Sequence, residues 1–294
     1  MTTTLHTLLG DYPVTHALRS GSIGSPLVNL SFADVKPVNK AFKRVVRDLE
    51  FDVAELAIVT FLIARSHGKP LVLLPAVVVA RFQHPLIVYS AERGTLKPED
   101  LPGRRVGVRS YSVTTGAWIR GILVDTYGVD AGRVTWVTFE EAHVAEFRDP
   151  PNVELAAPGK KLIEMLLAGE IDAAIVGDGM TPDPRIRTLI PDPAAAAAAW
   201  KQKHGAIQIN HMIAVKESYS RSHPEVVREY YRMLQESRRL AGGPNGFSIT
   251  ELNPFGVGAN RRNLEVAIDT VHKGGLIARR FSVDELFDEV TRIQ

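Results

Sequence analysis

The chain has 294 residues, 45% of them hydrophobic and 23% charged, so it is long enough for two modest domains or one large one with a buried core. Its net charge is only +2, from 35 basic and 33 acidic residues, and no run of Lys and Arg predicts binding to nucleic acid or a membrane surface. The absence of cysteine excludes disulfides, thiolate metal sites and a cysteine nucleophile. We therefore expect a small-molecule ligand.

The first residues, MTTTLHTLLGDYPV, lack the charged start, apolar run and cleavage site of a secretory signal. No stretch of about 18 uncharged apolar residues predicts a membrane span. From these two features we expect a cytoplasmic protein.

Helical and strand patterns alternate along the first half of the chain. The first helical pattern consists of four apolar residues: Phe42, Val45, Val46 and Leu49. Residues 70–82, PLVLLPAVVVARF, then predict a buried strand, and 105–109, RVGVR, predict a shorter one. The next segment, 112–128, predicts a helix that Thr114 or Thr115 caps and Gly128 ends.

The alternation continues in the second half. VTWVTF predicts a strand, and 160–178 predict a helix, a glycine stop and another strand. The alanine run after Pro193 predicts a short helix capped by Asp192. QINHMIAV predicts a strand, after which two capping boxes begin at Ser222 and Ser282. The order predicts an α/β fold with mainly parallel sheets.

Histidines stand near the start of two strand-like segments, His84 in RFQHPLIVYS and His211 in QINHMIAV. Residues 87–208 contain strand and helix units of their own, so we predict that they form lobe 2, inserted into a discontinuous lobe 1 of 1–86 plus 209–294. The chain then crosses twice between the lobes, and both histidines are expected at the floor of a ligand-binding cleft. Alternatively, each histidine packs at a strand end and bonds a backbone carbonyl.

Motifs of several enzyme classes are missing from the sequence. It has no P-loop, no G-x-G-x-x-G that opens a helix after a strand, and no G-x-S-x-G. Nucleotide-dependent enzymes and serine hydrolases are therefore not predicted.

Segments along nearly the whole chain resemble the 4,5-dihydroxyphthalate decarboxylase family. They are GDYPVTHALRSGSI, FDVAELAIVTFLIARSHGKP, DLPGRRVGVRSYSVTTGAWIRGILVDTYGV, VTWV, EEAHVAEF, PPNV, LLAGEIDAAI and INHMIAV. The family is similar to type II periplasmic-binding proteins, including those for riboflavin and thiamine precursors. The resemblance implies a two-lobed type II periplasmic-binding-protein-like fold, with two hinge strands and a ligand between the lobes.

The resemblance also implies a carboxy-lyase that converts a dihydroxylated aromatic acid, such as 4,5-dihydroxyphthalate, to protocatechuate and CO2. The positions that match the family are Asp11, Tyr12, Glu55, Arg81, His84, Thr114, Thr115, Trp118, Arg120, His143 and His211. Among them, Asp11 and Tyr12 are expected to bind the substrate.

Loss of CO2 from such a ring needs a proton at the carbon that bears the carboxylate, because direct loss would leave an unstabilised aryl anion. Histidine suits acid or base roles since its unperturbed pKa is about 6.5. We predict His211 as the general acid, with His84 or Glu55 engaging the hydroxyls. Equally, Glu55 can be a helix cap or a solvated loop carboxylate.

Cationic and hydroxyl side chains can bind the carboxylates of the substrate. Arg81 can clamp a carboxylate with two parallel hydrogen bonds, or it can pair with a buried acid. The hydroxyls of Ser112, Thr114 and Thr115 and the start of their helix predict a carboxylate seat, although capping alone also explains them.

Three further residues have a structural alternative. Trp118 can stack on an aromatic ligand or lie in the core. Arg120 lies on another face of the helix, where a surface ion pair is the preferred interpretation. Asp178 can accept a hydrogen bond from a substrate hydroxyl or serve only as a turn residue.

The segment EEAHVAEF contains Glu140, Glu141, His143 and Glu146. Together with His84 and His211, His143 is a candidate metal ligand, because imidazole and carboxylates bind divalent cations. A solvated acidic loop is the preferred interpretation, so no cofactor is predicted and a divalent metal is the open alternative.

Three functions remain open from the sequence. The first is the decarboxylase, which would bind a small aromatic carboxylate and neither nucleic acid nor membrane; the late helices leave a homo-oligomer open. The second is the solute-binding protein of an ABC importer for an aromatic or other small carboxylate or sulfonate, which requires a signal peptide or a lipid-attached cysteine. The third is a ligand sensor without catalysis.

Overall fold

The structure is a computed structural model that describes residues 2–177, 180, 182–242 and 251–294. Contacts between Cα atoms divide the chain into two compact units. Unit 1 comprises Met1–Arg81, Ile209–Asp269 and Ile277–Gln294, and unit 2 comprises Phe82–Gln208 and Thr270–Leu276. Within the described ranges, no helix has both the length and the apolar composition to cross a membrane.

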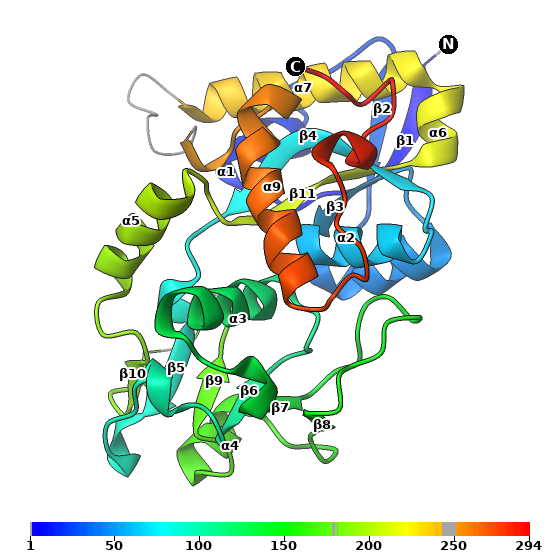
Figure 1. The fold of residues 1–294 in the computed structure, drawn as a ribbon. Coiled ribbons are helices and arrows are strands. Elements are labelled where there is room, and N and C mark those ends of the chain that lie inside the picture. The colour runs from blue at the N-terminus through cyan, green and yellow to red at the C-terminus, as the bar shows by residue number, and fades with distance from the viewer. Residues whose placement is uncertain (1, 178–179, 181, 243–250) are drawn as a thin grey trace. The chain divides into compact units, whose positions relative to one another are not determined.

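Unit 1 is built from strands and helices of both ends of the chain (Figure 1). Its elements are β1 (Thr3–Leu8), α1 (Pro13–Arg19), β2 (Val28–Phe32), η1 (Val38–Ala41), η2 (Arg44–Asp48), β3 (Val53–Ala57), α2 (Ile58–Ser66), β4 (Leu71–Ala80), β11 (Ile209–Lys216), α6 (Glu217–Ser222), α7 (Pro224–Gly242), α9 (Val257–Lys273) and η7 (Val283–Leu286). The last residues of α9, from Thr270, are grouped with unit 2.

The sheet of unit 1 has the strand order β2-β1-β3-β11-β4. β1 is parallel to β2 and β3, whereas β11 is antiparallel to both β3 and β4. Four strands therefore run in one direction, and β11, the first strand after the chain returns from unit 2, runs against them. All five residues of β3 are buried, as expected for a central strand covered on both faces.

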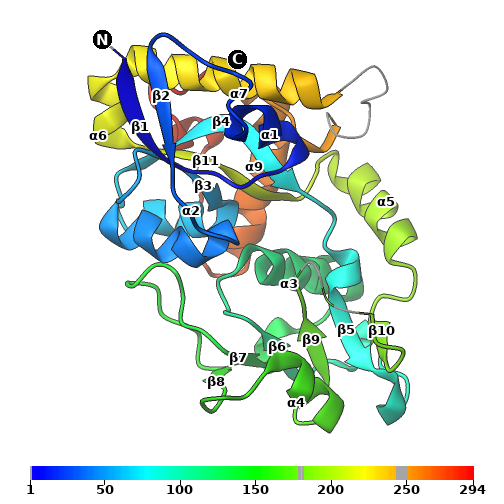
Figure 2. The same ribbon diagram turned by 180° about the vertical axis from the view of Figure 1, so that it is seen from behind.

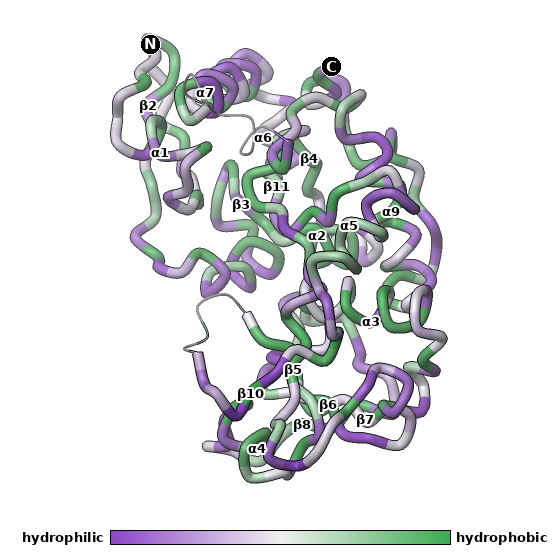
Figure 3. Tube along the Cα trace, turned by 90° about the vertical axis from the view of Figure 1, so that its left-hand side faces the viewer, coloured by the Kyte–Doolittle hydropathy of each residue, from purple (hydrophilic) through white to green (hydrophobic). Residues whose placement is uncertain are grey.

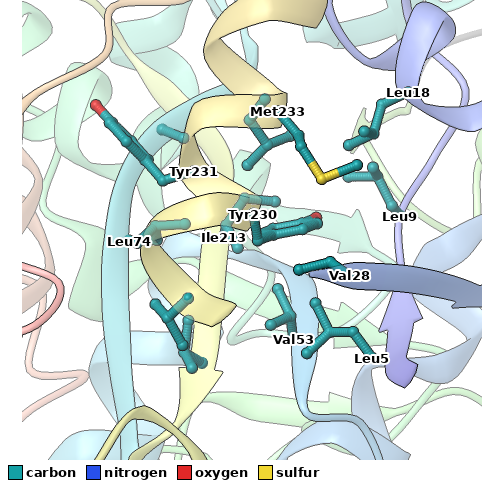
Figure 4. Packing of buried hydrophobic residues seen from close by; sticks show 14 of the residues in the cluster. Leu5, Leu9, Leu18, Val28, Val53, Leu74, Ile213, Tyr230, Tyr231 and Met233 are labelled. Carbon is teal, nitrogen blue, oxygen red and sulfur yellow. The ribbon is translucent and has the colours of Figure 1, made fainter. Parts of the chain in front are cut away.

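Helix α7 covers one face of this sheet. Its Tyr230 ring lies beside Val28 and Ile213 of the strands, and Met233 points towards Leu9 and Leu18 (Figure 4). Helix α1 packs beside α7, as the view from behind shows (Figure 2). α7 is mostly hydrophilic along its trace, whereas β3 and β11 are mostly hydrophobic (Figure 3). The amphipathic helix thus buries one apolar stripe and leaves its charged residues in water.

Unit 2 contains the elements between the two crossings of the chain (Figure 1). They are η3 (His84–Leu86), β5 (Ile87–Ser90), η4 (Ala91–Arg93), η5 (Pro98–Asp100), β6 (Arg105–Val108), α3 (Thr114–Tyr127), η6 (Ala131–Arg133), β7 (Thr135–Thr138), β8 (Val153–Leu155), α4 (Leu162–Ala168), β9 (Ala173–Ile175), β10 (Ile186–Thr188) and α5 (Pro193–His204).

The sheet of unit 2 has the order β10-β5-β9-β6-β7-β8. Strands β9, β6, β7 and β8 are parallel, and β5 is antiparallel to both β9 and β10. The reversed strand is again the first one after a crossing. The start and end of unit 2 are tied together, because the buried side chain of Gln208 accepts a hydrogen bond from the backbone N–H of Gln83 at 2.7 Å. The predicted α/β fold is confirmed, with two mixed sheets.

Several predicted helix ends are confirmed. Gly128 ends α3 in the left-handed conformation, with φ of 64°. The Asp192 carboxylate accepts a hydrogen bond from the N–H of Ala195 at the start of α5. The capping box at Ser282 is present, although the helix that it opens, η7, is a single short turn.

Two predictions about helices need correction. The N-cap of α3 is Val113, so Thr114 and Thr115 are the first two helical residues and do not cap the helix. The apolar pattern from Phe42 to Leu49 is not one regular α-helix. It contains the π-helical turn η2, which ends at Leu49 in the left-handed conformation.

Candidate functional site

The strand order of unit 1 creates a topological switch point between β1 and β3. After β1 the chain passes through α1 to β2 on one side, and after β3 it passes through α2 to β4 on the other. In open α/β sheets, ligands bind outside the carboxyl ends of the strands at such a point. The candidate site of unit 1 is therefore expected at the residues that end β1 and β3.

The turn that follows β1 folds the ring of Tyr12 over Gly10. A Cβ atom on Gly10 would lie 2.5 Å from three atoms of the Tyr12 side chain, so any larger residue would displace it. The buried Thr15 hydroxyl accepts from the Tyr12 N–H at 2.9 Å and donates to the Gly10 carbonyl at 2.7 Å. Pro13 then starts α1. The GDYP segment thus fixes Tyr12 at the carboxyl end of β1.

Glu55 lies in the middle of β3 and is the centre of a hydrogen-bonded network. Its side chain is 0% exposed and accepts from the Gly10 N–H at 2.7 Å and from the Tyr12 hydroxyl at 2.7 Å. Nδ1 of His211 lies 2.6 Å from the same oxygen that Tyr12 contacts. The interpretation of Glu55 as a cap or solvated loop residue is wrong, because a central strand buries it. Such a buried carboxylate is tolerated when several donors bond it.

His211 is held from two sides. It stands on β11, opposite Ala57 of β3, and the edge of its ring meets Phe42 at a centroid distance of 5.2 Å. Because Nδ1 is engaged by the Glu55 carboxyl group, Nε2 is the ring nitrogen left to bond a ligand. The side chain is 19% exposed. His211 therefore bonds a carboxylate and not a backbone carbonyl.

Burial, together with the charge of Glu55, keeps Tyr12 protonated. Burial raises the pKa of its hydroxyl far above the usual range, and the charge of Glu55 and the hydrogen bond to it act in the same direction. The positive charge of Arg81, which directly follows β4, opposes this shift. Burial lowers the pKa of Arg81. Tyr12 is thus a hydrogen-bond donor, with a cation in its electrostatic surroundings.

The neighbouring Asp11 does not join this network. Its carboxylate is 51% exposed and lies 2.9 Å from Nδ1 of His16, itself a surface residue. The structure therefore brings together Tyr12, Glu55 and His211, with Arg81 acting on Tyr12, and leaves Asp11 in a surface pair.

Unit 2 has a switch point of its own between β6 and β9, since the chain goes from β6 through α3 to β7 on one side and from β9 to β10 on the other. Ser112 and Thr114 are buried at the turn from β6 into α3, and Thr115 is half-buried. Trp118 is buried in the core, edge to face with Trp200 at 5.8 Å. Its surroundings favour the core alternative over stacking on a ligand.

The prediction of a surface ion pair for Arg120 is wrong. The residue is only 4% exposed, because α3 buries residues around most of its circumference. Its Nη2 donates to the Tyr111 carbonyl at 2.7 Å, and its guanidinium carbon lies 3.7 Å from the centroid of the Tyr111 ring. A buried cation thus supports the turn that contains Ser112.

His84 belongs to unit 2, whereas His211 belongs to unit 1. His84 is buried, and burial lowers its pKa to about 4, so the imidazole is neutral at pH 7. Among the described residues, its Nδ1 has no hydrogen-bond partner. His84 can therefore form a hydrogen bond with a ligand hydroxyl at neutral pH, whereas its burial opposes the uptake of a proton.

The remaining candidates are placed as follows. His143 is buried in an irregular segment after β7, in which Glu140 and Glu141 are exposed. Asp178 lies outside the described residues. In the part of the chain that the structure describes, no group of three or more His, Asp or Glu side chains is arranged to hold a metal ion.

Sequence comparison gives two named relatives. No model of a known protein family matches the chain. The chain is 27% identical over 245 residues to 4,5-dihydroxyphthalate decarboxylase of Comamonas testosteroni, covering 79% of this chain and 74% of that protein. It is 29% identical over 204 residues to the protein of the same name in Pseudomonas putida, covering 65% and 79%.

Structural comparison gives the fold. The alkanesulfonate-binding protein SsuA of Xanthomonas axonopodis pv. citri, solved with MOPS bound, superposes with a TM-score of 0.60 over 98% of this chain and 99% of that one, at 12% identity. The resemblance noted from the sequence is thus supported by both comparisons. The chain is a homologue of proteins named 4,5-dihydroxyphthalate decarboxylase and has a periplasmic-binding-protein-like fold.

Proposed function

We propose that the protein is a carboxy-lyase that removes CO2 from a dihydroxylated aromatic acid, with 4,5-dihydroxyphthalate as substrate and protocatechuate as product. The observation that carries this proposal is the buried Glu55 carboxylate that joins Tyr12 to His211. Similarity to two proteins that bear the decarboxylase name supports the choice of reaction.

His211 is the proposed general acid. Glu55 holds Nδ1, so Nε2 of the imidazolium can deliver a proton to the ring carbon that bears the carboxylate. A new C–H bond forms there, the bond to the carboxylate breaks, and CO2 leaves while its electron pair restores the aromatic ring. An ionised hydroxyl para to that carbon supplies electron density for the protonation, and solvent reprotonates His211 after product release.

Other residues have supporting roles in the proposal. Neutral His84 can accept a hydrogen bond from a substrate hydroxyl, since its pKa of about 4 leaves it unprotonated at pH 7. Arg81 can bind a carboxylate of the substrate. The Tyr12 hydroxyl could donate to a substrate only by giving up its hydrogen bond to Glu55. We therefore assign Tyr12 to holding the Glu55 carboxylate in place. No step of this mechanism needs a cofactor.

The second candidate function is ligand binding without chemistry. The similarity in fold to an alkanesulfonate-binding protein favours it, because the same architecture serves there to bind a solute. In either case the expected partner is a small aromatic acid. A cytoplasmic location remains a prediction, which fractionation of the native cells tests.

One experiment separates the two functions. Metal-stripped protein is incubated anaerobically with 4,5-dihydroxyphthalate in D2O, and CO2 and product are followed by chromatography and mass spectrometry. The decarboxylase releases one CO2 per product and places one deuterium on the ring carbon that lost the carboxylate. Binding by calorimetry without CO2, and without rescue by added divalent metal, would establish the second candidate.

A further inference from the structure

One peptide group connects Arg19 to the carboxylate of Glu55. The N–H of Gly10 donates a hydrogen bond to Oε2 of Glu55 at 2.7 Å. The carbonyl of the same peptide group belongs to Leu9, and it accepts a hydrogen bond from Nη1 of Arg19 at 2.8 Å. Arg19 therefore lies one peptide group away from the buried carboxylate that bonds Tyr12 and His211.

The side chain of Arg19 is fixed by two contacts. Arg19 is the last residue of α1, the helix that starts directly after the GDYP turn. Its guanidinium carbon lies 4.6 Å from the centroid of the Phe32 ring on β2, and Nη1 reaches back to the end of β1. A planar guanidinium can stack on a ring and donate at its edge at the same time. The geometry of the donor is thus set by the fold of unit 1.

The peptide group itself is buried. Leu9 is 1% exposed and lies in the apolar core of unit 1, where Met233 points towards it (Figure 4). Buried carbonyls are almost always bonded, because they have lost contact with water. Without Arg19 this carbonyl would need another donor, and rotation of the peptide group towards one would turn the Gly10 N–H away from Glu55. The bond to the carbonyl also polarises the peptide group and so strengthens the bond that its N–H donates.

The charge of Arg19 also reaches this part of the core. Burial raises the pKa of the Tyr230 hydroxyl on α7, the charge of Glu55 raises it further, and the charge of Arg19 opposes the shift. That hydroxyl therefore lies within the electrostatic reach of both groups. In the ranges that the structure describes, Arg19 forms no ion pair with a carboxylate. Its charge is thus not compensated by an acid at the surface.

We propose that Arg19 is a positioning residue for decarboxylation, which fixes the Glu55 carboxylate through the Leu9–Gly10 peptide group and thereby keeps His211 in its orientation. The effect on catalysis rests on the proposed function, whereas the hold on the peptide group does not. Arg19 was not a candidate from the sequence, although it lies within the segment GDYPVTHALRSGSI.

The test compares R19M with R238M. Arg238 is the matched control, because it also donates to a backbone carbonyl, that of Asn253 at 2.6 Å, and its guanidinium carbon also lies over a phenylalanine ring, that of Phe255 at 5.3 Å. For each full-length variant, kcat and KM for 4,5-dihydroxyphthalate are measured. The amide resonance of Gly10 is recorded by NMR without substrate, and urea denaturation gives the stability of each variant.

We expect the Gly10 amide proton to move upfield in R19M, because its hydrogen bond to Glu55 weakens. We expect kcat to fall about tenfold and KM to stay within about twofold of wild type, since Arg19 acts on the carboxylate and not on the substrate. R19K should recover part of kcat, because an ammonium group can still donate to the Leu9 carbonyl. R238M should keep the kcat and the Gly10 resonance of wild type, even if it is equally destabilised.

A double variant tests whether Arg19 acts through Glu55. In the E55Q background, R19M should cause little further fall in kcat, because the group that it positions is already altered. A further fall as large as in wild type would overturn the proposal. So would a Gly10 resonance and a kcat in R19M equal to those of R238M. If R19M does not fold, R19Q gives the same comparison. If wild type releases no CO2, the proposed function fails, and the Gly10 resonance alone still decides whether Arg19 holds the peptide group.

Discussion

Nδ1 of His211 lies 2.6 Å from Oε1 of Glu55, although 156 residues separate them in the chain. The contact forms because β11 returns to the sheet of unit 1 beside β3. Glu55 engages Nδ1, so the other imidazole nitrogen, Nε2, is the one that can act on a ligand. The proposed chemistry depends on this orientation, and each element of the network can be perturbed separately.

Gly10 is predicted to be essential for the position of Tyr12. A methyl group in G10A would lie 2.5 Å from the Tyr12 ring and force it away from Glu55. We expect kcat for decarboxylation to fall by roughly tenfold or more, because one of the groups that hold the Glu55 carboxylate is lost. Steady-state kinetics measures this. G24A is the control, since nothing lies within 4 Å of its added methyl group, and equal activity of the two variants would contradict the assignment.

Glu55→Gln tests the buried acceptor. The amide has one acceptor oxygen for three donors, so we expect the free energy of unfolding to fall by about 2 kcal/mol, and kcat to fall as His211 loses its orientation. Urea denaturation gives the stability change. Glu50→Gln, which removes an ion pair with Arg44 at the surface, should change the unfolding free energy by less than about 1 kcal/mol. If E55Q had the unfolding free energy and the kcat of wild type, the hydrogen bonds to Glu55 would not be needed for stability or for catalysis.

Because His84 is buried, the stability of the folded protein is expected to decrease in acid. Its pKa is about 4 in the folded protein and 6.5 unperturbed, so the unfolded chain binds more protons between these values. The stabilisation is complete above pH 6.5 and is lost as the pH falls towards 4, by roughly 2 to 3 kcal/mol. The free energy of unfolding, measured by urea titration, should therefore fall less in H84N than in wild type between pH 7 and pH 4. The expected difference between the two decreases is roughly 2 to 3 kcal/mol. H67N, which changes an exposed histidine, should follow the wild-type curve; identical curves for all three proteins would contradict the burial of His84.

Local pattern was sufficient for much of the fold. The strands at Leu71–Ala80 and Arg105–Val108, the end of α3 at Gly128 and the cap of α5 at Asp192 follow from apolar runs and from glycine and cap chemistry. These features depend on neighbours in the chain, which a sequence displays directly. The placement of Glu55 depends instead on β11, which arrives from a distant segment.

The preferred interpretation of Arg120 was wrong, and of the two equal interpretations of Glu55 only the catalytic one is compatible with its burial. Glu55 stands between apolar residues in FDVAEL, and Arg120 stands between apolar residues in AWIRGIL. These neighbours indicate buried segments, but charged side chains are usually exposed, and the sequence interpretation followed that rule. Arg120 and Glu55 are retained inside because carbonyl, aromatic and hydrogen-bonding partners surround them. Such partners become visible only when the tertiary structure is known. Tyr12, Glu55 and His211 were thus all named as candidates from the sequence, whereas the hydrogen bonds that join them were not predicted.

The most direct test of the account is turnover of 4,5-dihydroxyphthalate by H211N, beside wild type and H67N. Asparagine can keep a hydrogen bond to Glu55 but cannot deliver a proton as an imidazolium does. We expect kcat to fall by about 10²- to 10⁴-fold in H211N, with substrate affinity by calorimetry within a few-fold of wild type, and no change in H67N. Wild-type kcat in H211N would contradict the central claim that His211, held by Glu55, is the acid that protonates the ring.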